Sequence, residues 1–304
     1  MLLFVEQVLN GLQLGVMLFL MASGLTLVFG IMGLINLAHG SLYMIGAYVA
    51  ATVTLHTDSF LLGLAAALPA AALTGAIIER VVMARLYARE HLDQVLATFG
   101  LILFFNDLMV ILWGRQPLFM NVPDALAGTV EVLPGAPYPV FRLVIIAVGL
   151  LVALGLWYLI TRTRLGMRIR AGASDRETAG ALGIDIALLY TGVFALGAML
   201  AGLAGAMAGP ILAVEAGMGE SILILTFVVV VIGGIGSVRG ALIGALLVGV
   251  VDTLGRAFLP DLLALVLDRA TADGAGTSLS TMSVYILMAA VLVWRPKGLF
   301  PGHG

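Results

Sequence analysis

The chain has 304 residues, of which 62% are hydrophobic and 11% charged, with a net charge of −2 at pH 7 and no cysteine. Soluble domains contain about 25% charged residues, so this composition excludes a soluble protein. A chain without cysteine cannot form disulfide bonds, thiolate nucleophiles or cysteine-based metal sites. The N-terminus lacks a basic region before its first apolar stretch, so we expect that stretch to remain as a membrane span and not to be cleaved as a signal peptide.

Nine stretches are predicted to be membrane-spanning helices, because a span needs about 20 apolar residues. Two of them, 221–235 and 281–295, are short, so the sequence allows eight to ten spans. We predict an all-α polytopic transmembrane helical bundle that forms a single membrane domain over residues 1–304. The predicted spans are 8–30, 38–55, 60–83, 95–113, 141–161, 186–208, 221–235, 240–259 and 281–295.

The basic residues predict the orientation of the spans. With the N-terminus outside and the C-terminus inside, eleven of the fifteen Lys and Arg residues fall in cytoplasmic segments. Basic loops are retained on the cytoplasmic side, and the reverse orientation inverts the ratio. We therefore predict an N-out, C-in topology.

Two glycine-broken stretches interrupt the apolar pattern, one in each half of the chain, at 33–40 and 233–240. Such paired interruptions suggest duplicated halves and point to a transport pathway, since a broken helix is tolerated only beside protein or water. Alternatively, the polar side chains satisfy backbone groups freed at the break. No histidine is spaced near His39 as a second metal ligand, so we expect no metal site. The candidate pathway residues are Asn36, His39, Gly233, Gly236 and Ser237.

Two further polar residues, Asn106 and Asp107, fall within the fourth predicted span. An ionisable residue inside a membrane helix predicts a functional site, so we add both to the candidate pathway. The alternative is that Asp107 lies close to the outer surface and is simply solvated.

Two long connections are predicted on the outer side of the membrane. Residues 114–140 contain five prolines, which disfavour a helix and indicate an ordered extracytoplasmic loop. Residues 260–280 contain three aspartates and a run of small polar residues, and we predict a second extracytoplasmic loop there. Either loop is a plain connector or a contact surface for an external partner. Glu215 and Glu220 are placed in another outer loop, facing solvent or a docked partner.

The longest charged segment is 162–185, which carries five arginines between two predicted spans. Its charge places it on the cytoplasmic side. Its second half is predicted to form a short amphipathic helix, with Ser174 as the N-cap, Glu177 at the capping-box spacing and Gly183 at the helix end. The segment is therefore expected to present a helix to the cytosol.

Small residues in the second half of the chain predict close helix packing. Gly197, Ala201, Gly205 and Gly209 recur every four residues, and Gly236, Gly240 and Gly244 repeat this spacing. Small residues at such intervals let membrane helices approach closely. Asp252 and Arg256 stand four residues apart on one helical face, which favours a structural ion pair.

No catalytic motif is present in the sequence. It contains no Walker A pattern, nucleophile elbow or HExxH motif. Two buried carboxylate candidates are little support for a proton-coupled carrier. The sequence therefore favours a pathway subunit that is embedded in the lipid bilayer, has no cofactor of its own, binds no nucleic acid and draws its energy from other proteins.

The residues around these motifs resemble a known family. Glu177-Thr178-Ala179 followed by Gly183 is similar to the EAA-x3-G signature of permease subunits of bacterial ABC importers, with Thr178 departing from the usual alanine. Residues 36–40 (NLAHG), the following Tyr43, Gly46 and Ala47, and the stretch 233–245 (GGIGSVRGALIGA) resemble the LivH-type permease of branched-chain amino acid importers. The similarity extends over essentially the whole chain.

This resemblance implies a heteromeric importer in the bacterial inner membrane. Its other subunits would be a second permease of the LivM type, two ATP-binding subunits that use the ATP, and a periplasmic binding protein that delivers a branched-chain amino acid. A permease for urea or short amides is the alternative within the family. A secondary ion-coupled carrier and a membrane scaffold are alternatives outside it. By the resemblance, the coupling helix that docks on the ATP-binding subunit comprises Asp175, Arg176, Glu177, Ala179 and Gly183.

Overall fold

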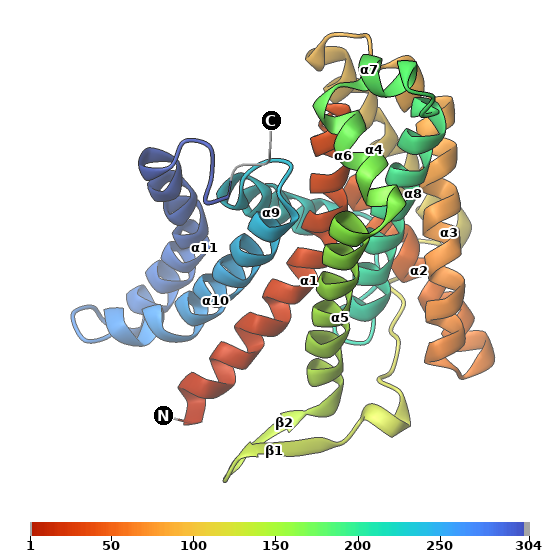
Figure 1. Ribbon diagram of the computed structural model, residues 1–304. Helices are drawn as coiled ribbons and strands as arrows, with labels where there is room; N and C mark the ends of the chain where they lie inside the picture. Colours follow the sequence, from red (N-terminus) through yellow and green to blue (C-terminus); the bar gives the residue numbers. More distant parts are fainter. Residues whose placement is uncertain (1, 301–304) are drawn as a thin grey trace.

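A computed structural model describes residues 2–300, with the backbone alone described at Leu133 and Ala136. Helices dominate, and one short antiparallel hairpin accompanies them (Figure 1). The elements in chain order are α1 (Leu2–Met32), α2 (His39–Thr57), α3 (Phe60–Val81), η1 (Met83–Arg85), α4 (His91–Trp113), η2 (Asp124–Leu126), β1 (Thr129–Leu133), β2 (Ala136–Pro139), α5 (Val140–Arg162), α6 (Arg164–Ser174), α7 (Arg176–Ala181), α8 (Ile186–Ala208), α9 (Met218–Gly233), α10 (Val238–Leu263) and α11 (Arg269–Trp294).

The all-α membrane bundle predicted from composition is confirmed. Seven helices are long and apolar enough to cross a membrane: α1, α3, α4, α5, α8, α10 and α11. The two remaining predicted spans, 38–55 and 221–235, are also helical, as α2 and α9, but α9 has 16 residues and falls short of a full crossing. The number of crossings and the orientation in the bilayer stay predictions.

Helix α1 is the centre of the molecule and is buried along most of its length (Figure 1). Its glycines let α10 pack backbone against backbone. A Cβ atom added to Gly11 would lie 2.7 Å from the Cα atom of Val250, and one added to Gly15 would lie 2.8 Å from the Ala245 carbonyl oxygen. Because the residue numbers rise along α1 as they fall along α10, the two helices are antiparallel.

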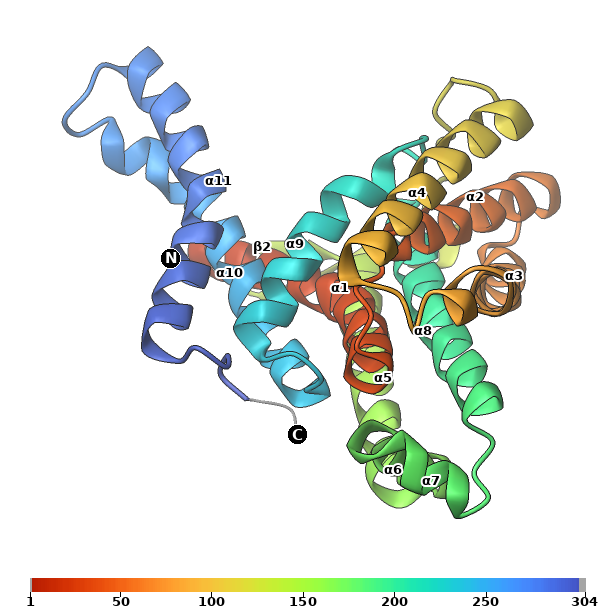
Figure 2. The same ribbon diagram turned by 90° about the horizontal axis from the view of Figure 1, so that it is seen from above.

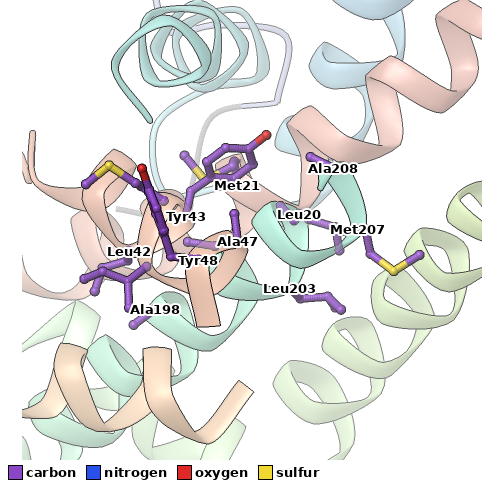
Figure 3. Packing of buried hydrophobic residues seen from close by; sticks show 14 of the residues in the cluster. Leu20, Met21, Leu42, Tyr43, Ala47, Tyr48, Ala198, Leu203, Met207 and Ala208 are labelled. Carbon is purple, nitrogen blue, oxygen red and sulfur yellow. The ribbon is translucent and has the colours of Figure 1, made fainter. Parts of the chain in front are cut away.

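Helix α8 packs on the other side of α1 and also runs antiparallel to it. A Cβ atom on Gly24 would lie 2.6 Å from the Gly197 carbonyl oxygen, and the Tyr190 hydroxyl donates to the Ile31 carbonyl oxygen at 3.4 Å. The predicted close packing at Gly197 is therefore confirmed. The apolar cluster between α1, α2 and α8 forms the core of the molecule, with Tyr43 and Tyr48 among its largest buried side chains (Figure 3).

Helix α2 runs parallel to α8 in this core. The backbone of Gly46 touches that of Gly202, and Ala50 packs with Ala206. Helix α3 completes the group of α2, α3 and α8 on one side of α1, while α10 and α11 lie on the other side (Figure 2). Packing through small residues thus replaces the large interlocking side chains of a soluble core.

The predicted loop 114–140 is ordered. It contains the β1–β2 hairpin, in which Thr129 pairs with Pro139, and the Tyr138 hydroxyl donates to Asn10 Oδ1 at 3.1 Å, which ties the hairpin to α1. A backbone bridge joins Leu118 to Val214, with both N–O distances at 2.9 Å. The hairpin lies at the opposite end of the molecule from α7 (Figure 1).

The second predicted loop, 260–280, is largely helical, so its extent was wrong. Helix α10 continues to Leu263, and α11 already begins at Arg269 behind the N-cap Asp268, whose carboxylate accepts from the Thr271 amide at 3.0 Å. The small residues of this stretch support helix packing: Gly276 lies directly against Pro260. The expected pair of Asp252 and Arg256 is present as a bidentate ion pair at 2.9 and 3.0 Å.

Candidate functional site: two helix breaks and a charged helix pair

The first helix break returns the chain to the middle of the bundle. A Cβ atom on Gly24 of α1 would lie 3.0 Å from Nε2 of His39, the first residue of α2. Gly24 also packs against Gly197, the twelfth of the 23 residues of α8. Because Gly24 precedes the end of α1 by eight residues, or about 12 Å of helix, residues 33–38 turn back into the bundle before α2 begins.

Asn36 and His39, two of the predicted pathway residues, lie at this break and are fully buried. Neither polar atom of the Asn36 amide and neither ring nitrogen of His39 has a hydrogen-bond partner within residues 2–300. Unpaired buried polar atoms are rare in folded proteins. The break between α1 and α2 therefore differs from the core around it in holding four buried polar atoms without partners in the described part of the chain.

A second break, residues 209–217, leads from α8 into α9. Helix α9 begins after Gly217, whose φ of +88° is a left-handed conformation that glycine adopts readily. The first turn of α9 meets the first turn of α2: a Cβ atom on Gly40 would lie 2.9 Å from the Gly219 carbonyl carbon.

Helices α2 and α9 run away from this meeting point in opposite directions. Helix α9 is antiparallel to α10, because Gly233 packs on Gly240 and Val229 on Gly244. Since α10 and α8 are both antiparallel to α1, α9 is parallel to α1 and α2 is antiparallel to it. The N-termini of two helices therefore face each other inside the bundle.

A narrow recess opens at this junction, and α4 forms its opposite wall. Its polar lining consists of Gly40 and Ser41 from α2, Gly219 and Glu220 from α9, and Asn106 from α4. Asn106 Nδ2 donates to Glu220 Oε1 at 2.6 Å. This bond joins residues 114 positions apart and connects α4 to α9.

The recess also has an apolar wall, formed by Leu37, Met44, Ile102 and Leu223. Asp107, the neighbour of Asn106, is exposed on α4 and does not line the recess. Glu220 was expected in an outer loop but belongs to the first turn of α9, because the helix begins three residues before the predicted span. The acid is exposed, and its carboxylate accepts from Asn106 of α4.

The second group of predicted pathway residues lies elsewhere. Gly233, Gly236 and Ser237 form the turn between α9 and α10, at the other end of α9 and about 21 Å along its axis from Gly219. Ser237 caps α10 by accepting from the Gly240 amide at 3.1 Å. The structure therefore brings Asn36, His39 and Asn106 to one region, while the 233–237 turn packs against the end of α1, where a Cβ atom added to Gly30 would lie 3.0 Å from the Gly236 Cα atom.

The charged segment 162–185 contains two helices, where the sequence predicted one. The unpredicted helix α6 begins after its N-cap Thr163, whose hydroxyl accepts from the Gly166 amide at 3.1 Å. It buries Gly166 and Ile169, and the Arg170 guanidinium donates to the Ile160 carbonyl oxygen at the end of α5. Helix α6 is thereby fixed to the membrane helix that precedes it.

Helix α7 is the predicted short helix, displaced by one residue at its start. Ser174 ends α6, and Asp175 is the N-cap, accepting from the amides of Glu177 and Thr178 at 2.9 and 3.0 Å. Asp and Ser are comparable N-caps, and here the Asp175 carboxylate takes the role one residue after the predicted serine. Gly183, with φ of +88°, ends the turn as predicted, and the Ile184 amide closes it on the Ala179 carbonyl oxygen at 3.1 Å.

The environment of Asp175 favours its charged form. Hydrogen bonds from the Thr178 hydroxyl and from the amides of Thr178 and Glu177 hold the pKa of the Asp175 carboxyl below its usual range. Of the five predicted coupling residues, four are exposed and Ala179 alone is buried. The next residue after the helix, Leu182, is 79% exposed, so the tip presents an apolar side chain among charged ones.

A buried carboxylate that sequence reasoning missed lies near the start of α8. Glu79 is 2% exposed and accepts from the Tyr87 hydroxyl at 2.7 Å and the Thr191 hydroxyl at 2.6 Å. Tyr87 also packs edge-on against Tyr190, with ring centroids 5.2 Å apart. The network joins α3, the segment before α4, and the first two turns of α8, which follows the α6–α7 segment.

The signals that would have found these residues are simple. Glu79 is an ionisable residue inside a predicted span, which by itself predicts a functional site. Glu220 lies one residue outside a predicted span, within the usual error of a helix boundary. Ser41 and Gly219 carry no such signal, because the contact of two distant helix N-termini creates their environment.

The comparisons with known proteins agree with this architecture. Residues 7–293 match the family described as branched-chain amino acid transport system, permease component. The chain is 32% identical to the high-affinity branched-chain amino acid transport permease BraD of Pseudomonas aeruginosa, over 97% of this chain and 95% of that protein. It is 34% identical to LivH of Salmonella typhimurium, over 84% and 87% of the two chains.

A more distant relative is named for a different substrate. The chain is 30% identical to the ribose import permease RbsC of Escherichia coli, over 76% of this chain and 71% of that protein. No solved structure gives a significant match. Together, the apolar helices and the match over nearly the whole chain place the protein in the inner membrane as a multi-pass transport subunit, and the chain belongs to the family of branched-chain amino acid transport system permeases.

Proposed function

We propose that the chain is the permease subunit of an ATP-driven importer of branched-chain or related small amino acids, and that α7 is its coupling helix. The observation that carries the proposal is the α6–α7 segment. It combines an exposed helix with the EAA-like residues Glu177, Ala179 and Gly183, and its caps Thr163, Asp175 and Asp185 fix three consecutive helices in relation to one another.

Such a segment suits the transmission of force. Asp185 caps α8 by accepting from the Leu188 amide at 2.9 Å, and α6 is anchored to the end of α5 by Arg170. A push on α7 therefore reaches two membrane helices without an intervening flexible linker. Rigid-body movement of helices is the usual basis of alternating access.

The proposed assembly contains four kinds of subunit. α7 docks in an ATP-binding subunit, of which there are two. A second permease of the LivM type completes the membrane part, and a periplasmic binding protein delivers the substrate to the end of the molecule that carries the β1–β2 hairpin. The chain itself supplies no ATPase site and uses no cofactor.

Two alternatives predict different observations. A permease for urea or short amides would share the family and the coupling helix, and the similarity to a ribose permease shows that family resemblance alone does not fix the substrate. A secondary carrier would transport without ATP and would not need an exposed docking helix. Uptake in proteoliposomes with and without ATP, using leucine and urea as substrates, separates these cases.

The coupling helix is tested by Glu177→Arg in the complex purified from gently solubilised membranes. Glu177 is exposed, so we expect normal insertion, with a loss of helix stability of at most about 1 kcal/mol from the reversed charge at the N-terminus. A reversed charge at a docking surface costs several kcal/mol, so we expect recovery of the ATP-binding subunits or ATP-driven uptake to fall at least about tenfold.

The matched control is Glu131→Arg, an exposed charge reversal on β1 at the far end of the molecule. It should leave the recovery of ATP-binding subunits unchanged. Wild-type assembly and uptake in the Glu177→Arg variant would refute the assignment of α7. Transport by the chain alone without ATP would refute the importer.

A further inference from the structure

The junction of α2 and α9 holds hydrogen-bond donors that no residue of the described chain uses. Ser41 is 3% exposed and lines the recess, yet within residues 2–300 its hydroxyl makes no hydrogen bond. In the first turn of α2, the amides of His39 and Ser41 donate to Asn36 and Ala38, whereas the Gly40 amide has no such acceptor. Gly40 itself lines the recess.

The first turn of α9 repeats this arrangement. The amides of Met218 and Glu220 donate to the carbonyl oxygens of Glu215 and Gly217 at 3.3 and 3.0 Å, and the Gly219 amide has no acceptor within the described chain. Neither helix has a side-chain cap. Two free glycine amides, each in the positive first turn of a helix, thus lie beside one recess.

The acidic residue of the recess, Glu220, complements a positive charge. The Glu220 carboxylate is exposed and bonds to Asn106 through one oxygen, and no Lys, Arg or His lines the recess. A carboxylate among membrane helices that has no basic partner favours a cationic ligand group. The apolar wall of Leu37, Met44, Ile102 and Leu223 is of a kind that accepts an aliphatic chain.

We infer that this recess is a transient binding site for the zwitterion of an aliphatic amino acid. The Gly40 and Gly219 amides and the Ser41 hydroxyl would bind the carboxylate, Glu220 the ammonium group, and the apolar wall the side chain. The inference rests on the proposed function, because it assigns the substrate of the importer to a place in this subunit. Urea has neither a carboxylate nor an ammonium group, so it could not make the two charged contacts that this recess offers.

The recess is narrow in this structure, so binding requires one wall to move. Helix α4 is the wall that can do so, since it buries a single stripe of residues, including Ile102 and Phe105, against the rest of the chain. The Asn106–Glu220 hydrogen bond holds α4 closed over the recess. An ammonium group that binds Glu220 in place of Asn106 would break this hydrogen bond and free α4 to move.

The test uses the complete importer in proteoliposomes with photo-leucine, a leucine analogue that carries a diazirine in its side chain. After ATP-driven turnover and irradiation, we expect cross-links to Met44, Ile102 or Leu223 by peptide mass spectrometry. Ser41→Ala and Glu220→Gln should each lower both cross-linking and leucine uptake at least about tenfold, because the first removes a hydrogen bond to the substrate carboxylate and the second removes the negative charge that pairs with the ammonium group.

Two controls separate the possible outcomes. Ser23→Ala removes a buried hydroxyl that bonds to the Leu20 carbonyl oxygen outside the recess, and it should retain both signals; the subunit composition of each purified complex verifies folding. Failure of the wild-type complex to take up leucine would refute the proposed function. Wild-type uptake with cross-links confined to other segments, or with both recess variants as active as Ser23→Ala, would overturn the binding site alone.

Discussion

Glu79 is a buried acidic side chain whose two carboxyl oxygens each accept a hydrogen bond from a hydroxyl group inside the bundle. A buried carboxylate without hydrogen bonds is strongly disfavoured, and here Tyr87 and Thr191 donate to its two oxygens at 2.7 and 2.6 Å. Arg80 is more distant, with its Nε 3.9 Å from Glu79. The carboxylate therefore connects three segments of chain through hydrogen bonds.

We predict that Glu79→Leu destabilises the protein mainly through the Tyr87 hydroxyl, which loses its carboxylate acceptor, whereas Thr191 can still donate to the Ala187 carbonyl oxygen at 2.9 Å. Each unpaired buried group costs about 1–3 kcal/mol, so thermal unfolding of the purified permease in detergent should occur several degrees lower. Glu79→Gln, which keeps an acceptor, should lose less. Equal unfolding temperatures for wild type and Glu79→Leu would contradict this role for the network.

The cap of α7 predicts an absence of pH dependence in the assay range. The folded-state pKa of Asp175 is lowered from its ordinary 3.8 by Thr178 and its neighbouring amides, so the cap contributes fully above that value and is lost as the pH falls below it. Between pH 5 and 8, amide hydrogen exchange at Glu177 and Thr178, corrected for intrinsic rates, should be constant in the intact permease. A loss of protection within that range would show that another group controls the helix.

At the scale of the elements, glycine contacts determine which helices can lie together. The backbone of Gly46 in α2 touches that of Gly202 in α8, and neither backbone can move away without separating α2 from the core. By contrast, Gly155 in α5 has no atom within 4 Å of the position of an added Cβ.

We therefore predict opposite results for two identical substitutions. Gly46→Ala should overpack the α2–α8 contact and cost about 1–3 kcal/mol, lowering the unfolding temperature and the yield of folded protein. Gly155→Ala should leave both unchanged. The comparison is made by thermal unfolding in the same detergent, and a tolerated Gly46→Ala would mean that α2 and α8 are packed more loosely than the structure shows.

The sequence predicted where the helices occur along the chain, but not how deep in the bundle they start. All nine predicted spans coincide with helices, because long apolar runs are a strong signal. The depth at which α2 starts was not predictable, since it depends on the contact of Gly24 with His39 and Gly197 across the fold. For the same reason the sequence did not predict that the first turns of α2 and α9 meet at Gly40 and Gly219, while the 233–237 turn packs against Gly30 near the end of α1.

The charged and polar segments show the same limit. The sequence predicted α7 and the glycine that ends it. It did not predict α6, because the arginines of α6 mask the pattern of the face on which Gly166 and Ile169 are buried. Helix α11 begins well before its predicted start because its first turns are built from small and polar residues. Apolar length is a poor guide where small residues do the packing.

At the scale of the whole molecule, the cysteine-free sequence allows the orientation to be tested directly. Glu131→Cys places a single thiol in the hairpin and Leu182→Cys places one at the tip after α7, at opposite ends of the molecule (Figure 1). A membrane-impermeant maleimide should label the first in intact spheroplasts and the second only after permeabilisation. Labelling of Leu182→Cys in intact spheroplasts would show that the orientation is opposite to the predicted one.

The central position of α1 has a consequence for biosynthesis. It is the first helix to leave the ribosome, yet its contact between Gly11 and Val250 joins residues almost 240 positions apart. At bacterial elongation rates this separation corresponds to roughly 10 to 50 seconds, during which a glycine-lined groove faces lipid or an insertion factor. The first half of the chain therefore cannot complete its packing before the second half is made, and a nascent permease that stalls after α8 would reach quality control with the α10 side of α1 still uncovered.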